Sequence, residues 1–112
     1  MIRTLNLEAG MPNTKTARLR LTEGLRTARL AGYKAVKLIH GYGSSGRGGT
    51  IRRMTLEELS RMKKRGQIRA YASGEDFSPF SEDGRKIALA IPQAAQDRDY
   101  SRGNDGITVV LL

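Results

Sequence analysis

The residues with the clearest chemical potential lie in one glycine-rich stretch, HGYGSSGRGG, at residues 40–49. Glycines let successive backbone N–H groups converge on an anion, and a helix that starts directly after such a turn adds the positive end of its dipole. Arg47, Arg52 and Arg53 surround this position, and Lys37 precedes it. Together they predict a loop and a helix start that bind the phosphates of nucleic acid.

The same stretch contains an aromatic ring and a group that can transfer protons. Tyr42 can stack on an unpaired base, because aromatic faces bind bases with little sequence preference. His40 has an ordinary pKa near neutrality, so it can act as a general acid or base in phosphodiester cleavage, with Glu8 nearby if the first two strands are neighbours. The alternatives for His40 are a binding contact, or hydrogen bonds that shape the loop backbone.

Other ligand-binding patterns fit the sequence less well. The stretch from Gly41 to Gly46 has the glycine spacing of a P-loop, but Arg47 and Gly48 stand where Lys and then Ser or Thr are required. The Rossmann fingerprint fails, because the loop follows the second expected strand and its glycine spacing differs. Without cysteine and with one histidine, no zinc site is expected, and the acidic pairs match no calcium loop. We expect no cofactor, and a divalent metal only if the protein is a nuclease.

The composition favours a polyanionic partner. The 112 residues include 20 Lys and Arg against 11 Asp and Glu, which gives a net charge of +9 at pH 7. Such a charge attracts DNA or RNA, and an excess of Arg over Lys favours forked contacts to phosphates or base edges. No apolar stretch is long enough for a signal peptide or a membrane span, so we expect a cytoplasmic protein without a membrane partner. The length fits one domain, residues 1–112.

Four short apolar segments predict the strands that position the loop. They cover residues 2–7, 35–39, 67–72 and 106–112. The second is bounded by chain breakers and is mostly apolar, which is typical of an internal parallel strand. Strand, helix and strand in this order predict a right-handed βαβ unit.

The first helix of that unit has clear start and stop signals. Asn13 or Thr14 can cap its beginning, and Gly32 is well placed to end it. Apolar residues recur on one face at helical spacing, opposite an arginine-rich face. Gly24 lies near the apolar face, where it allows close approach to the sheet.

The later helices are less sharply bounded. The second is expected to start at Thr50, directly after the glycine-rich stretch, and the alternative is a capping box that begins with Thr55. A third, short helix is predicted over residues 82–91, and another helical turn within residues 93–105. Phe77 and Phe80 are predicted to form a hydrophobic plug under the loop that precedes the third helix.

These features together resemble the Smr domain, the small MutS-related nucleic-acid-binding module. The resemblance rests on the stretch from Ile39 to Gly43 with Gly46 beyond it, which matches the family's His-Gly-x-Gly-x-Gly signature, and on a terminal strand of the Thr-Val-Val-Leu type. It implies a two-layer α/β sandwich of βαβαββ order, similar to the C-terminal domain of translation initiation factor three. Members of the family bind DNA or RNA, and several cleave it.

The chain departs from the family pattern in its first strand, its glycine loop and the connection to its last strand. The family's first strand usually ends in Asp-Leu-His-Gly, a motif tied to endonuclease activity. Here Asn6-Leu7-Glu8-Ala9 stands in its place, so the acid and the histidine have both changed. The glycine loop is longer than in the family, and an extra helical insertion precedes the last strand, where the family often has a tight hairpin.

We therefore expect a nucleic-acid-binding module that uses the glycine-rich loop, a helix N-terminus and a basic face. One alternative is an Smr-type endonuclease that nicks DNA or cleaves RNA with His40 and Glu8. A second is a protein-interaction module whose basic surface docks an acidic partner. The residues expected to bind nucleic acid are Lys37, His40, Gly41, Tyr42, Gly43, Gly46, Arg47, Arg52 and Arg53.

Overall fold

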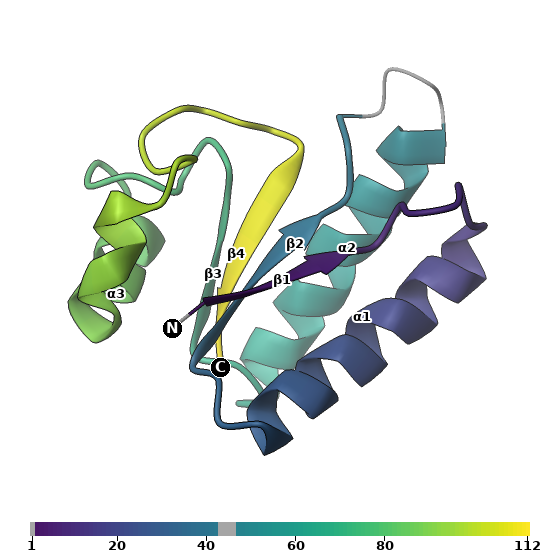
Figure 1. Ribbon diagram of the computed structural model, residues 1–112, viewed down its shortest axis with the longest axis horizontal. Helices are drawn as coiled ribbons and strands as arrows, with labels where there is room; N and C mark the ends of the chain where they lie inside the picture. The colour runs from purple at the N-terminus through teal and green to yellow at the C-terminus, as the bar shows by residue number, and fades with distance from the viewer. Residues whose placement is uncertain (1, 43–46) are drawn as a thin grey trace.

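The computed structural model describes residues 2–42 and 47–112, and the structural statements below concern those residues. Helices and strands alternate through most of the chain before a helical segment and a last strand (Figure 1). The elements are β1 (Ile2–Asn6), α1 (Thr14–Leu30), β2 (Ala35–Ile39), α2 (Arg47–Lys64), β3 (Ala70–Ser73), α3 (Glu82–Ala90), the 3-10 helix η1 (Pro92–Gln96) and β4 (Ile107–Leu111). This confirms the predicted α/β class.

The strands form one mixed sheet in the order β1-β2-β4-β3. β1 and β2 run parallel, with Ile2 opposite Ala35 and Leu5 opposite Leu38, and β4 is antiparallel to both of its neighbours. The prediction that residues 35–39 form an internal strand is confirmed. Because β1 and β2 are adjacent and parallel, both end at the same edge of the sheet.

α1 and α2 cover one face of this sheet. Leu21 and Leu25 of α1 and Leu59 of α2 belong to one buried apolar cluster with Val36 and Val110 of the sheet. A Cβ at Gly24 would overlap the side chain of Leu5, which confirms that this glycine allows α1 to approach β1 closely. The close contact between α1 and β1 therefore depends on Gly24 in the helix and Leu5 in the strand.

The ends of α1 agree with the sequence, whereas the start of α2 does not. The Asn13 side chain accepts a hydrogen bond from the backbone N–H of Thr16 at 2.8 Å, and Gly32 follows the helix with a φ of +87°. α2 begins at Arg47, so both predicted starts, at Thr50 and at Thr55, are wrong. Glycines contribute no apolar periodicity, and the sequence pattern therefore could not show how far the helix extends into the glycine-rich stretch.

The predicted insertion is present and adds a partial third layer to the predicted two-layer sandwich. α3 and η1 lie on the side of β3 and β4, away from α1 and α2 (Figure 1). Val109 and Val110 are neighbours in β4 but belong to different apolar clusters, because successive residues of a strand face opposite sides. The insertion supplies the second cluster with its own buried side chains, which include Phe77, Ile87, Ile91 and Ala94.

The prediction that Phe77 and Phe80 form a buried hydrophobic plug is confirmed for Phe77 only. Phe77 is fully buried, and its ring meets that of Tyr100 edge to face with centroids 5.1 Å apart. Phe80 is 91% exposed, so its predicted burial is wrong. Pro79 separates the two rings in sequence, and only Phe77 points towards the sheet cluster.

None of the described helices is long and apolar enough to cross a membrane.

Candidate nucleic-acid interface

Two helices begin near the edge of the sheet where β1 and β2 end. α1 and α2 both start at this end of the sheet (Figure 1). A small cleft of ≈ 220 Å³ lies between the two helix starts and is lined by Pro12, Asn13, Thr14, Thr50 and Ile51. The first turn of each helix contains no acidic residue. The positive ends of both helix dipoles therefore remain without a carboxylate in their own first turns.

Two arginines of α2 stand close to this edge without acidic partners. Arg53 is exposed and Arg52 is half-buried, and neither forms an ion pair with a described residue. Other helix arginines are partly neutralised: Arg18 and Arg61 both contact the carboxylate of Glu58, at 3.5 and 2.6 Å. The uncompensated positive charge of α2 therefore includes its first turns, where the sequence predicted phosphate contacts.

His40 lies beneath this edge rather than on it. Its side chain is 0% exposed, with Nδ1 3.0 Å from the carbonyl oxygen of Gly41 and Nε2 2.8 Å from the hydroxyl of Thr108. Because a carbonyl can only accept, Nδ1 carries the proton and donates to Gly41, and Nε2 accepts from Thr108. The backbone N–H groups of His40 and Gly41 both donate to the carbonyl of Gly106, at 3.0 and 3.1 Å. His40 therefore ties the start of the loop to β4.

The charge state of His40 follows from its surroundings. Burial lowers the pKa of His40 below its ordinary 6.5, and the charge of Arg52 lowers it further. The hydrogen bond to Gly41 and the charge of Asp105 act in the opposite direction and are outweighed. The imidazole is accordingly neutral near pH 7, with both nitrogens engaged by the protein.

Glu8 lies beside the loop as the sequence anticipated. The parallel pairing of β1 and β2 brings it to Gly41, and a Cβ at Gly41 would overlap its carboxylate. Gly41 has a φ of +80°, a conformation that favours glycine. The described residues show no hydrogen bond between Glu8 and His40, because the imidazole contacts Thr108. The two predicted catalytic residues therefore lie near one another without a direct hydrogen bond between their side chains.

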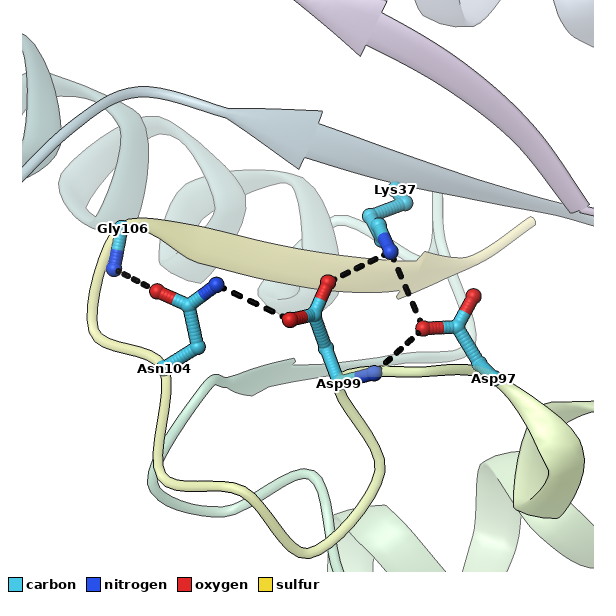
Figure 2. Close-up of polar contacts among 5 residues, drawn as sticks. All are labelled: Lys37, Asp97, Asp99, Asn104 and Gly106. Carbon is cyan, nitrogen blue, oxygen red and sulfur yellow. Dashed lines mark hydrogen bonds and ion pairs between the residues drawn. The ribbon is translucent and has the colours of Figure 1, made fainter.

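Lys37 is held by the insertion. It is 8% exposed, and its ammonium contacts the carboxylates of Asp97 at 2.9 Å and Asp99 at 2.5 Å. Figure 2 shows that these contacts continue, since Asp99 accepts from the Asn104 side chain at 2.9 Å and Asn104 accepts from the Gly106 backbone at 3.0 Å. Two carboxylates thus neutralise a cation that the sequence predicted on the basic face.

The pKa values of this pair reflect the same contacts. Desolvation by itself lowers the pKa of Lys37, but the hydrogen bonds and charges of Asp99 and Asp97 outweigh it and raise the pKa above 10.5. Desolvation raises the pKa of Asp99, but the hydrogen bonds from Asn104 and Lys37 and the Lys37 charge bring it below 3.8. Both groups are therefore charged at neutral pH.

Tyr42 is the exposed aromatic group of the loop. It is 66% exposed, and a Cβ at Gly106 would stand 3.2 Å from its Cζ atom. The ring is thus placed against the backbone at the start of β4, with most of its surface open to solvent. Gly43, Gly46 and the side chain of Arg47, which the sequence also assigned to the site, lie outside the described residues.

Comparison with known proteins agrees with the geometry. The family model of the Smr domain matches residues 9–77, more than half of the chain. The chain belongs to the Smr domain family. Smr domains are generally associated with nucleic-acid binding or nuclease activity. No curated protein and no solved structure matches the chain significantly.

The part of this Smr domain outside the match builds a second feature of the site. Residues 78–112 contribute Arg98, Asn104 and Ile107 to a pocket of ≈ 400 Å³ on the sheet face opposite α1 and α2. Glu8 and Tyr42 stand at the same pocket, next to the edge where β1 and β2 end. Sequence reasoning missed this pocket, because no motif marks residues 97–106 and their position depends on the ion pairs of Lys37.

The pocket region contains acidic groups but no metal centre among the described residues. No three His, Asp or Glu side chains of residues 2–42 and 47–112 come together as metal ligands. Asp105 has one buried carboxylate oxygen, Oδ1, without a hydrogen-bond partner in this part of the chain.

Proposed function

We propose that this Smr domain binds nucleic acid at the edge where β1 and β2 end. Arg52 and Arg53 contact backbone phosphates, together with the N–H groups at the starts of α1 and α2, and Tyr42 stacks on a base. The proposal is carried by one observation: two helix starts without acidic residues meet beside two arginines that lack ion-pair partners among the described residues. Phosphates bind readily at such helix starts, and arginine offers them forked hydrogen bonds.

Lys37 and His40 have different roles in this proposal. Lys37 holds the insertion through Asp97 and Asp99, so it contributes no free charge to the bound strand. His40 positions the loop through Gly41 and Thr108. A neutral, fully buried imidazole with both nitrogens engaged is poorly placed to take a proton from an external nucleophile. We therefore propose binding without cleavage by His40.

The test compares two double variants of the same helix. Arg52→Ala/Arg53→Ala removes two charges at the start of α2, and Lys64→Ala/Arg65→Ala removes two exposed charges at its far end. Loss of two phosphate contacts reduces the slope of log affinity against log salt by about 1.4 for single strands or about 1.8 for duplex DNA. We expect this change in the first variant and little change in the control, with titrations of labelled RNA and DNA as the measurement.

The same samples, incubated with Mg²⁺ or Mn²⁺, report on cleavage. We expect retarded bands without strand breaks. Breaks that disappear in His40→Ala would support the endonuclease alternative instead. Equal salt slopes for the two double variants would contradict the proposed interface. If neither RNA nor DNA is retained at low salt, an acidic protein partner becomes the better explanation of the basic surface.

A further inference from the structure

We propose that the pocket beside this edge receives one unpaired base of the bound strand, with Tyr42 stacking on it and Glu8 reading its hydrogen-bond donors. The inference rests on the proposed nucleic-acid binding and adds a substrate class to it, single-stranded or looped nucleic acid with a preference for guanine. It goes beyond the family match, because one wall of the pocket is built by residues after position 77.

The size and position of the pocket suit a single nucleotide. Its volume is ≈ 400 Å³, near the lower end of the range of roughly 300–1,000 Å³ for small-ligand pockets. Thr4, Ile39 and Ile107 form part of its floor on the sheet, and Arg98 belongs to its wall. A duplex cannot enter such a space with its bases paired, whereas a base that has left the stack can. Recognition of unstacked bases on aromatic side chains is the common mode for single strands.

Tyr42 is placed to form one side of the base site. Its ring is supported at Gly106, where an added Cβ would stand 3.2 Å from Cζ, and 66% of the residue is exposed. A supported ring loses less freedom on binding than a mobile one, because part of its ordering is complete before the ligand arrives. Stacking of one base on an aromatic side chain changes affinity by roughly 5- to 150-fold.

Glu8 is the free acceptor of the pocket. Its carboxylate is half-buried against Gly41 and forms no hydrogen bond or ion pair with any residue that the structure describes. Three other polar side chains of the lining are already engaged: Lys37 contacts Asp99, and the Asn104 amide is used at both its oxygen and its nitrogen (Figure 2). An incoming ligand therefore meets a carboxylate that needs donors.

The chemistry of Glu8 selects among the bases. The Watson–Crick edge of guanine presents two adjacent N–H donors, which match the two oxygens of a carboxylate. Adenine, cytosine and uracil each place an acceptor next to their donor on that edge, so they offer a carboxylate one good hydrogen bond. The negative charge of Glu8 also keeps phosphate out of the pocket, and the exposed guanidinium of Arg98 at the wall attracts phosphate outside it.

The test measures base preference in the wild-type protein first. Labelled oligouridylates carry a central guanine, inosine or adenine, and a guanine-containing hairpin stem of equal length serves as the duplex. We expect the guanine strand to bind about tenfold tighter than the adenine strand, which corresponds to one extra hydrogen bond of about 1.4 kcal/mol. Inosine lacks one donor of guanine, so it offers the carboxylate one hydrogen bond and should bind about as tightly as the adenine strand. A stem that binds as tightly as the guanine strand would overturn the inference.

Two variants with matched controls then locate the preference. Glu8→Gln should bring the guanine-to-adenine ratio close to one, whereas Glu82→Gln, an exposed acid at the start of α3, should leave it unchanged. Tyr42→Ala should weaken single strands by roughly 5- to 150-fold and spare the stem. Phe80→Ala removes an even more exposed ring elsewhere and should have no effect. Thermal unfolding confirms that each variant is folded.

The outcomes separate this inference from the proposed function. If the wild-type protein shows no base preference but Arg52→Ala/Arg53→Ala lowers the salt slope, nucleic-acid binding stands and the pocket inference is wrong. A guanine preference that survives Glu8→Gln overturns the role of Glu8. If the arginine variant behaves like its control and no strand is bound, both proposals are wrong.

Discussion

The two faces of the sheet are covered in different ways. On one face, α1 and α2 together bury an apolar cluster that includes Leu21, Leu38 and Leu59. On the other face, the insertion covers β3 and β4 with Phe77 and Ile87 and leaves an open pocket next to β1. The family match includes both helices of the first face and ends at Phe77, before α3 and η1 of the second.

The two faces of the sheet therefore contribute differently to the candidate site. The helix face fixes where α1 and α2 begin, and their starts create the edge at which we propose that anions bind, without a contribution from the insertion. The insertion face decides what lies beside that edge. Besides the apolar cluster, a buried lysine connects the insertion to the sheet, because Lys37 on β2 contacts Asp97 and Asp99 on the insertion.

The variant with the largest expected effect removes the contacts of Lys37 with the insertion. Lys37→Met leaves two largely buried carboxylates without their cation, and we expect a loss of about 3 kcal/mol in the free energy of unfolding. Lys63→Met is the matched control, because its ammonium contacts Asp83 at 3.3 Å on the surface, where an ion pair contributes less than about 1 kcal/mol. Urea unfolding measures both values.

The region of the protein that loses stability in Lys37→Met is as informative as the size of the loss. In Lys37→Met, amide hydrogen exchange should accelerate in residues 97–106, while the middle of α1 and α2 keeps its protection at conditions where the protein is folded. Neutralising one carboxylate in Lys37→Met/Asp99→Asn should restore part of the stability. If the two single lysine variants lose equal stability, the buried contacts do not connect the insertion to the sheet as the structure implies.

The sequence predicted the helix face well because local patterns determine it. The spacing of Leu21 and Leu25, the cap at Asn13 and the stop at Gly32 are all visible within a few residues of one another. The glycine-rich motif likewise lies at the edge where we propose that nucleic acid binds. The start of α2 was placed too late, because glycines carry no signal of helical periodicity.

The insertion face was harder to predict because it depends on contacts between distant residues. The expectation of a free Lys37 followed from its type and its strand, but Asp97 and Asp99 are about sixty positions away in sequence. His40 shows the same effect, since its partner Thr108 lies in the last strand. Residue type indicated the chemistry that each side chain can perform, and the sheet order decided which of them reach solvent.

Because His40 is buried, we expect the free energy of unfolding to depend on pH. Its folded pKa is lowered by burial, so the unfolded chain takes up a proton at higher pH than the folded protein does. The stability that depends on neutral His40 is therefore complete above pH 6.5 and is lost as the pH falls through the lowered folded pKa. The loss amounts to at most about 1.4 kcal/mol for each pH unit.

The measurement is the free energy of unfolding from about pH 8 to about pH 4.5, above the range in which the pKa of Asp99 contributes. His40→Gln keeps a neutral polar side chain at the position and should remove the decline that the wild-type protein shows below pH 6.5. Parallel curves for the two proteins would mean that His40 is not held neutral in the folded state.

The smallest effect concerns two glycines with similar backbones and different neighbours. Gly32 and Gly41 have φ values of +87° and +80°, so alanine is strained at both positions, by about 1 kcal/mol. A Cβ at Gly32 meets nothing within 4 Å, whereas one at Gly41 overlaps the Glu8 carboxylate. Both alanine variants should therefore lose similar stability from the backbone, with a further loss at Gly41 if Glu8 cannot move aside.

Only the variant at Gly41 should alter recognition, because its methyl group displaces the carboxylate that faces the pocket. We expect Gly41→Ala to lower the guanine-to-adenine ratio in the oligonucleotide titration, and Gly32→Ala to keep the wild-type ratio. If both variants preserve the ratio, the position of Glu8 against Gly41 does not control base preference. If both lower it, strain at the end of α1 reaches the pocket, and the two faces of the sheet are coupled more closely than their separate apolar clusters suggest.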